Sequence, residues 1–247
     1  MLEPVPGEPA ALALGPERAL VVADYHAGLE VALRRDGVEL RSQAADRREQ
    51  LLELVERTAP DRVVFLGDLA NAIGDPGREE RRELRTLLSA LADRLPVTVV
   101  KGNHDGGIEG VVEDIDGVSV TGTGGIRVGP VGLVHGHTWP DPDVLRAEVL
   151  GVAHEHPMVR LEDEVGGARA ERAWLRGRLN ADVFTENVPD APAVDGELVL
   201  FPGFNDLLGG TWTNTGQGFL SPFLPEGLLD GEAYLLDGTR LGPYERL

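Results

Sequence analysis

The histidines of this chain are few, and most of them gather in one part of the sequence. Four of the six lie between residues 133 and 157, in "LVHGHTWPDPDVLRAEVLGVAHEHP", as two pairs with the same X-H-X-H spacing. The full set is His26, His104, His135, His137, His154 and His156. Imidazole can bind a divalent transition metal, and it can also donate or accept a proton near neutral pH.

Carboxylate and amide side chains accompany the histidines in short motifs. These are Asp24 and His26 in "ADYHAG", Asp68 in "FLGDLAN", and Asn103, His104 and Asp105 in "VKGNHDGG". Any one of these motifs is most often only a solvated turn, because Gly, Asn and Asp all favour turns. All six histidines fall inside or beside the motifs, however, which favours one shared site over scattered turns.

An apolar run precedes each motif and predicts a β-strand. The runs are Ala19–Ala23, Arg62–Leu66, Val97–Val100, the "VGLV" that starts at Val131, and Ala147–Ala153. Helical periodicity between the first three runs predicts helices over 28–37, over 42–58 with Ser42 as a cap, and near 78–95. Strands that alternate with helices indicate βαβ units and a largely parallel sheet. Because ligand sites in such sheets lie outside the carboxyl ends of the strands, five strand ends should bring these polar groups to one edge.

The second half of the sequence has a different pattern. "MVRLED", "ERAWLRGRL", "GELVLF" and "EAYLLDGTRLGPYE" predict strands, with Asp237-Gly238 as a hairpin turn. The segment from Asn180 to Gly196 is rich in Pro, Asp and Ala and predicts a loop. Since no repeat or linker divides the chain, we expect one α/β domain over residues 1–247. Its metal motifs lie within 20–157, and strands of a second, more antiparallel sheet make up most of 158–247.

The charge of the chain is strongly acidic. There are 42 acidic and 23 basic residues, giving a net charge of −19, and Lys101 is the one lysine among the bases. Such a surface favours solubility through self-repulsion and is typical of proteins from halophiles, although a GC-rich genome would also make lysine scarce. It argues against tight non-specific binding of nucleic acid, an argument that high intracellular salt weakens.

Composition also excludes several classes of protein. Without cysteine the chain has no disulfide, thiolate metal site or cysteine nucleophile. No run approaches the 18 apolar residues that predict a transmembrane helix, so no membrane partner is expected. The N-terminal "MLEPVPGEPA" lacks the basic region of a secretory signal, and a cytoplasmic location is therefore expected.

The ligand types favour a pair of divalent ions. Imidazole and carboxylate together suit Mn, Fe, Zn or Ni. A two-metal site needs a bridging group, and Asp68 is the natural bridge because it stands alone at its strand end after Gly67. Asp24 and His26 are two residues apart, so in extended chain they face the same side and can reach one ion.

The order of the motifs resembles that of the calcineurin-like metallophosphoesterases. D-x-H, G-D-x-x-N, G-N-H-D, H and X-H-x-H follow one another between Leu20 and Pro157. The "LSPF" and "GTRLG" segments extend the resemblance to an archaeal, SbcD-related and ICC-like branch that includes DNA-repair nucleases. The resemblance implies a four-layer αββα sandwich of mixed sheets, the metallo-dependent phosphatase fold.

The same resemblance implies a dinuclear centre, with Mn²⁺ as the expected ion and Fe, Zn or Ni as alternatives. One ion would be held by Asp24, His26, Asp68 and His156, and the other by Asp68, Asn103, His135 and His154. His104 would act as general acid, Asp105 would hold its orientation, and a metal-bridged hydroxide would attack phosphorus. The family usually has Gly where this chain has Ala153, and many members have Asp where it has Asn71. The pattern needs only the first histidine of "HGH", so His137 is expected beside the metals or facing substrate.

Three functions follow from this interpretation. The first is hydrolysis of a phosphomonoester or phosphodiester in a phosphorylated small molecule. The second is a nuclease that acts on DNA or RNA in repair, and a basic stripe beside the metal edge would favour it. The third is a non-catalytic metal-binding scaffold, which the filled ligand positions disfavour. The pair Arg34-Arg35 could contact substrate phosphate, although an exposed helical charge pair is the favoured interpretation. The sequence does not identify a protein partner.

Overall fold

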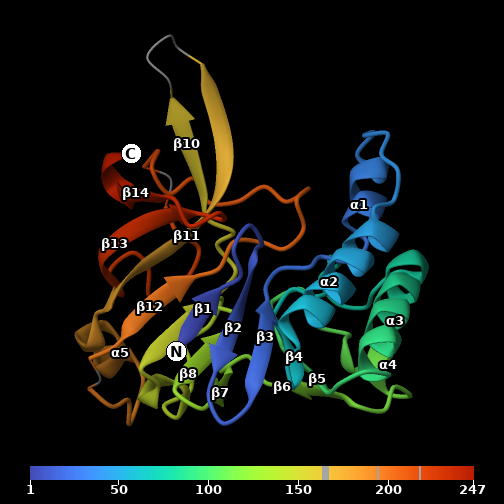
Figure 1. The fold of residues 1–247 in the computed structure, drawn as a ribbon, viewed down its shortest axis with the longest axis horizontal. Coiled ribbons are helices and arrows are strands. Elements are labelled where there is room, and N and C mark those ends of the chain that lie inside the picture. The colour runs from blue at the N-terminus through green and yellow to red at the C-terminus, as the bar shows by residue number, and fades with distance from the viewer. Residues whose placement is uncertain (163–166, 194, 217) are drawn as a thin grey trace.

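Two β-sheets lie face to face in the computed structural model, which describes residues 1–162, 167–193, 195–216 and 218–247 (Figure 1). The first sheet has the order β1 (Leu2–Pro4), β2 (Ala10–Leu14), β3 (Arg18–Val22), β4 (Arg62–Leu66), β5 (Val97–Val100), β6 (Val118–Thr121). Strands β3 to β6 are parallel, and β1 and β2 add an antiparallel hairpin to β3. The predicted βαβ units are therefore confirmed.

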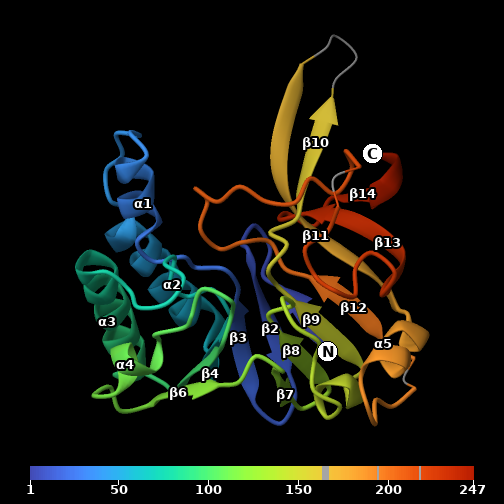
Figure 2. The same ribbon diagram turned by 180° about the vertical axis from the view of Figure 1, so that it is seen from behind.

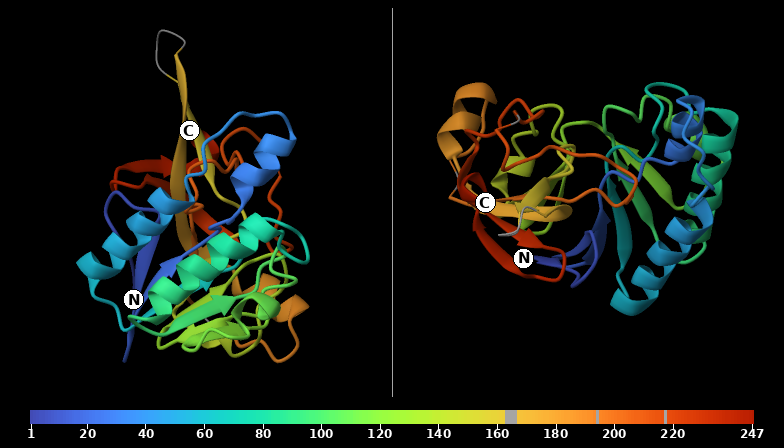
Figure 3. Two further views of the ribbon diagram at one scale, coloured as in Figure 1. Left: turned by 90° about the vertical axis from the view of Figure 1, so that its right-hand side faces the viewer. Right: turned by 90° about the horizontal axis from the view of Figure 1, so that it is seen from above.

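The second sheet is mixed. Its order is β14 (Arg240–Pro243), β13 (Leu228–Leu235), β11 (Ala168–Leu179), β12 (Glu197–Leu200), β9 (Val149–Val152), β8 (Val131–Val134), β7 (Ile126–Val128). Strands β8, β9 and β12 are parallel, whereas the others pair antiparallel. Strand β10 (Met158–Glu162) pairs with the first part of β11, and the two project beyond the body of the molecule (Figures 1 and 3).

Helices cover the outer faces of the two sheets. They are α1 (Leu29–Arg35), α2 (Ala44–Thr58), α3 (Arg78–Ala92), α4 (Glu109–Val112), α5 (Ala181–Asn187), and the 3₁₀ turns η1 (Val144–Arg146) and η2 (Tyr244–Arg246). Figure 3 shows α2 and α3 on the first sheet, and Figure 2 shows α5 on the far side of the second. No helix among the described residues is both long and apolar enough to cross a membrane.

The alternation of side chains along the strands builds three core layers. In β3, Leu20 and Val22 pack toward α2 and α3, whereas Val21 between them packs toward the second sheet. Phe184 of α5 closes a third layer on the outer face of the second sheet. A strand buried on both faces is apolar at nearly every position, and this explains why the sequences of these strands are continuous apolar runs. The expected four-layer sandwich of mixed sheets is confirmed.

Two local expectations were wrong. The segment 180–196, expected as a loop, contains helix α5, whose seven residues bury Phe184 alone and are too short for helical periodicity to show. Ser42 does not cap α2, because the cap position is Gln43 and the Ser42 hydroxyl only accepts a 3.4 Å hydrogen bond from the Ala44 amide. Neither difference moves the strands that carry the motifs.

Candidate metal centre

The seven predicted metal ligands all lie at the carboxyl ends of five strands. Strands β3, β4 and β5 of the first sheet deliver four of them, and β8 and β9 of the second deliver three. Six of them, together with His104, form three groups of donor atoms within 4.8 Å of one another: Asp24, His26 and His156; His26, Asp68 and His104; Asp68, His135 and His154. The seventh, Asn103, places Oδ1 3.1 Å from His135 Nε2. The site is therefore shared by the edges of both sheets, and His26 and Asp68 each belong to two of the groups.

The backbone is strained where the ligands leave their strands. A positive φ occurs at Asp24 (54°), His26 (45°), Asp68 (43°), His154 (71°) and His156 (43°). Non-glycine residues rarely adopt this conformation, and it persists where surrounding structure enforces it. It turns these side chains off the strand direction and into the shared space.

Two glycines allow the ligand loops to approach one another. A side chain at Gly67, which has φ of +76°, would overlap the ring of His135. A side chain at Gly102 would overlap the backbone nitrogen and carboxylate of Asp68. These two positions of the "GD" and "GN" motifs thus need glycine because ligand atoms occupy the space of a Cβ.

Carboxylates face imidazole rings inside the cluster. Asp24 Oδ1 lies 3.2 Å from His156 Nε2, and Asp68 Oδ2 lies 3.4 Å from His135 Nε2 and 3.6 Å from His26 Nε2. All five of these residues are buried or nearly so, and the Asp24 and His135 side chains are fully buried. Water therefore screens these interactions weakly.

Burial and charge together shift the pKa values of the cluster. Burial opposes ionisation of Asp68, but contact with the ring and charge of His135 holds its pKa well below the usual range. Burial also disfavours a charged His135, yet the carboxylates of Asp68 and Asp24 raise its pKa to about 9. Burial lowers the pKa of His26 to about 4. These shifts favour an ionised Asp68 beside a charged His135, an arrangement whose proton a bound cation would replace.

The donor set fits a bound cation. Buried atoms of three predicted ligands, Asp24 Oδ1, His26 Nε2 and His156 Nε2, lie within 4 Å of a carboxylate or imidazole of the cluster but make no hydrogen bond among the described residues. Unpaired buried polar atoms are costly, and here they face a common space. A divalent ion would satisfy all three.

The histidine rings are oriented for ligation through Nε2. His135 Nδ1 donates to the Leu66 carbonyl at 3.2 Å, and His156 Nδ1 donates to the Gly209 carbonyl at 3.1 Å. The Nδ1 atom of His26 lies 3.3 Å from Asn71 Oδ1. A hydrogen bond on the far nitrogen fixes the tautomer and leaves the other nitrogen free for a metal.

His104 lies at the rim of the cluster. Its backbone nitrogen donates to Asp68 Oδ1 at 2.9 Å, and its Nε2 lies 3.9 Å from Asp68 Oδ2. Its Nδ1 donates to the carbonyl of Asn71. The ring is more exposed than the buried ligands, as a group that meets substrate must be.

Asp105 was expected to orient the His104 ring, but its carboxylate accepts hydrogen bonds from other residues. One of its carboxylate oxygens accepts from Ala70 N at 3.0 Å and the other from Gly102 N at 2.9 Å. It is fully buried, and burial raises its pKa to about 6. Asp105 therefore ties the two motif loops together, while Asn71, to which the sequence assigns no metal role, orients both His104 and His26.

A family comparison agrees with this geometry. The model of the family described as "Calcineurin-like phosphoesterase" matches residues 17–190, a range that contains every predicted ligand. The chain belongs to the calcineurin-like phosphoesterase family. No curated protein matches the sequence.

One solved structure has the same fold as this chain over nearly the full length of both. A nuclease from Pseudomonas putida, MPE, is 18% identical, with a TM-score of 0.56, and the match covers 98% of this chain and 100% of that one. A weaker match is the phosphoesterase Yfce from E. coli, which is 17% identical, with a TM-score of 0.40, over 91% of this chain and 96% of that one.

Departures from the usual motifs of the calcineurin-like phosphoesterases are accommodated locally. Ala153, in place of Gly, is fully buried, and its nitrogen donates to the His135 carbonyl at 2.9 Å. His137 packs against two ligands, with ring centroids 5.2 Å from His135 and 6.1 Å from His154, and belongs to none of the three donor groups. Burial lowers the pKa of His137 to about 4, so this ring is neutral beside the cluster.

Sequence reasoning missed a segment from the second half of the family member that holds the ligand loops. Asn205, 1% exposed, donates from Nδ2 to the carbonyls of Tyr25 (3.1 Å) and His26 (3.4 Å). Glu155, fully buried between two ligand histidines, accepts from Thr211 Oγ1, from Leu220 N and from Ser221 N. The chain after β12 therefore holds both the D-x-H and the H-x-H segments in place.

We expect Asn205→Ala to weaken metal binding about 10–100-fold, as for other residues that orient ligands. The change removes the side-chain donor to the Tyr25 carbonyl and one of the two donors to the His26 carbonyl, which also accepts from Leu29 N, and so it loosens the D-x-H segment. Isothermal titration with Mn²⁺ measures the effect. Asn187→Ala is the matched control, since Asn187 also donates to a backbone carbonyl but lies in α5. An Asn205→Ala protein that is folded by circular dichroism and binds Mn²⁺ as tightly as the control would exclude this role.

Proposed function

We propose that the protein is a dinuclear metal-dependent phosphoesterase, with Mn²⁺ as the expected ion. The observation that carries this proposal is the donor cluster, in which buried ligand atoms make no hydrogen bond and the Asp68 carboxylate lies between His26 of one proposed set and His135 of the other. Asp24, His26, Asp68 and His156 would hold one ion, and Asp68, Asn103, His135 and His154 the other. Membership of the calcineurin-like phosphoesterase family supports hydrolysis of a phosphoester bond.

The candidate site residues have distinct roles in the proposed reaction. When bound, two divalent ions would polarise the phosphoryl oxygens and lower the pKa of water at the site. Asp68 and Asp24 supply the negative charge that retains them. His104, held by Asn71 through Nδ1, turns Nε2 toward the site, where it donates a proton to the leaving oxygen. Proton donation from a positioned side chain contributes roughly 10²–10⁴-fold to the rate.

A nuclease is the second candidate. The solved structure of a nuclease shares the fold over the whole chain, and the SbcD-like segments of the sequence point the same way. A scaffold without catalysis is disfavoured, because each ligand position and His104 are filled. The strongly acidic composition favours a small substrate, whereas the distribution of arginines described below favours a nucleic acid.

An activity screen with Mn²⁺ at high salt tests the proposed function. The substrates are single-stranded DNA, a cyclic nucleotide and a chromogenic phosphodiester, each with and without EDTA. We expect metal-dependent hydrolysis of at least one of them. A protein with bound Mn²⁺ that hydrolyses none of the three would contradict the proposal and revive the scaffold interpretation.

Removal of metal is expected to destabilise the protein. The cluster leaves Asp24 Oδ1 and two imidazole nitrogens unpaired, so Mn²⁺ binds the folded chain in preference to the unfolded one. A hundredfold excess over Kd contributes about 2.7 kcal/mol to the free energy of unfolding. Thermal melting with EDTA and with increasing Mn²⁺ should show Tm rising with metal concentration. If Tm is the same in EDTA and in saturating Mn²⁺, the cluster does not bind this ion.

A further inference from the structure

Some arginines of this acidic protein form ion pairs with acidic residues, and others do not. Most form ion pairs with Asp or Glu, as Arg47 does with Glu30 and Glu83. Arginines whose side chains have neither an ion pair nor a hydrogen bond, in the part of the chain that the structure describes, are Arg35, Arg41, Arg48, Arg78, Arg82 and Arg246. Four of these line two cavities beside helix α1.

The two cavities adjoin each other and the metal centre. The first, of about 320 Å³, is lined by Arg35, Arg78 and Asn71. The second, of about 340 Å³, is lined by Arg48 and Arg82, and it shares Gly28, Val31 and Glu79 with the first. Asn71 contacts both His26 and His104, so the first cavity begins at the rim of the candidate site. Together they form a depression along α1 that begins at Asn71, and we call it the arginine channel.

The carboxylates of the arginine channel are already engaged, with one exception. Glu79 pairs with Arg34 at 3.0 Å. Glu80 accepts hydrogen bonds from backbone nitrogens, including those of Asn71 and Ala72. Glu30 and Glu83 pair with the buried Arg47. Asp75 is the acid of this lining that has no partner among the described residues.

Unpaired guanidinium groups are therefore available at the place where a substrate would leave the site. Arginine binds phosphate oxygens through two parallel N–H donors, which makes it the preferred residue for phosphate recognition. The two cavities in series offer room for more than one phosphate, which favours a strand over a small diphosphate. The lining of the two cavities has five carboxylates and five arginines and so no net charge. In a chain of net charge −19 it therefore repels a polyanion less than the average surface does.

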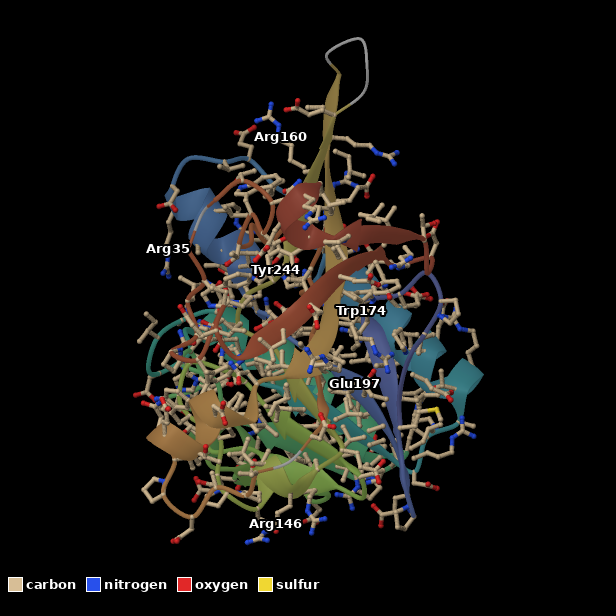
Figure 4. The ribbon with its side chains drawn as sticks, turned by 90° about the vertical axis from the view of Figure 1, so that its left-hand side faces the viewer. Arg35, Arg146, Arg160, Trp174, Glu197 and Tyr244 are labelled. Atoms are coloured by element: carbon tan, nitrogen blue, oxygen red, sulfur yellow. The ribbon has the colours of Figure 1, made fainter. Side chains whose placement is uncertain are left out.

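We propose that the arginine channel binds the phosphates that neighbour the scissile one in a nucleic-acid strand. Arg35 and Arg78 would contact the first neighbouring phosphate, and Arg48 and Arg82 those beyond it. The inference rests on the proposed function and names its substrate class. Figure 4 shows Arg35 at the end of α1 and Arg146 at the bottom of the molecule, well away from it. Arg146 precedes β9, so it lies at the other end of the strand from the ligand histidines.

Binding tests the channel separately from catalysis. In a His104→Ala background with Mn²⁺, anisotropy of a short fluorescein-labelled oligothymidylate reports binding without cleavage. We expect Arg35→Ala/Arg78→Ala to raise Kd about tenfold, and the slope of log K against log salt to become shallower by about 0.7 for each phosphate that is no longer neutralised. Asp75→Asn should tighten binding about two- to threefold by removing a repulsive charge. Arg146→Ala is the control and should leave Kd unchanged.

Activity separates the strand from other substrates. With His104 intact, the double variant should raise KM for the oligonucleotide about tenfold relative to KM for bis(p-nitrophenyl) phosphate, which has no second phosphate. An equal effect on both would indicate a structural defect and overturn the proposal. If the double variant raises KM only for a small diphosphate ester, the ligand of the arginine channel is a small diphosphate and not a nucleic-acid strand. If the double variant has an unchanged Kd for the oligonucleotide, the arginine channel does not bind the strand, even if the enzyme hydrolyses DNA. If the protein binds the oligonucleotide through the arginine channel but hydrolyses no substrate, only the proposed function is contradicted.

Discussion

Asp68→Asn is expected to lower kcat/KM by at least about 10³-fold, or roughly 4 kcal/mol of transition-state stabilisation. Asp68 is the carboxylate that lies against His26, His104 and His135, and it belongs to two of the donor groups. Asparagine has the same shape but no negative charge, so both ions would lose affinity together. Metal analysis of the purified variant and steady-state kinetics measure the two effects.

The matched control for this change is Asp230→Asn. Asp230 also has a positive φ, of 53° against 43° at Asp68, so the two substitutions place the same backbone demand on asparagine. Asp230 pairs with Arg178 on the surface of the second sheet, away from the cluster. We expect this variant to keep full metal content and activity. If Asp68→Asn retains two ions and the activity of the control, Asp68 does not bridge them.

His104→Ala is expected to retain its metal but to lose about 10²–10⁴-fold in kcat. The ring lies at the rim of the cluster, with Nδ1 bonded to Asn71 and Nε2 free to meet substrate, and it is outside the two proposed ligand sets. Metal content and kcat are measured on the same preparation. A variant that loses metal in proportion to its activity would make His104 a ligand instead of an acid.

The leaving group provides the internal control for His104. A p-nitrophenolate leaves without a proton, whereas an alkoxide needs one, so general-acid catalysis matters only for the second. We therefore expect His104→Ala to lose much less activity on a p-nitrophenyl ester than on an alkyl ester or nucleotide. An equal loss on both classes of substrate would contradict the general-acid role.

The strands that carry the motifs could be predicted from the sequence because each is apolar on both faces. The predicted boundaries of Arg62–Leu66 and Val97–Val100 coincide with β4 and β5. The hairpin of β1 and β2 was not predicted, because its alanines and prolines give a weak strand signal. Helix α5 was also missed, since a single buried Phe184 provides no periodicity.

The convergence of the candidate metal ligands could be predicted because a motif at the end of a strand lies where that strand ends. The residues that orient them could not. Asn205 lies about 180 residues from the segment that it holds, and its hydrogen bonds go to backbone carbonyls, which any sequence provides. Asp105 was assigned to its neighbour His104, but a side chain in a tight loop bonds the nitrogens that surround it. Adjacency in sequence was a poor guide to contact here.

Net charge alone leaves the substrate class open. The total of −19 argues against nucleic acid, but total charge carries no information on where the charges lie. Arg34 and Arg35 are neighbours on α1 and have different surroundings, since Arg34 pairs with Glu79 while Arg35 lines the arginine channel. Both side chains are exposed on the helix, as expected for a charge pair. Local pairing, which only the fold determines, distinguishes the two.

Anomalous diffraction from crystals grown with Mn²⁺ tests the central claim most directly, because it locates the ions independently of any substrate. The account predicts two peaks, one on either side of the Asp68 carboxylate. One should be coordinated by Asp24, His26 and His156, and the other by Asn103, His135 and His154. A single peak, or peaks that Asp68 does not join, would contradict a dinuclear centre.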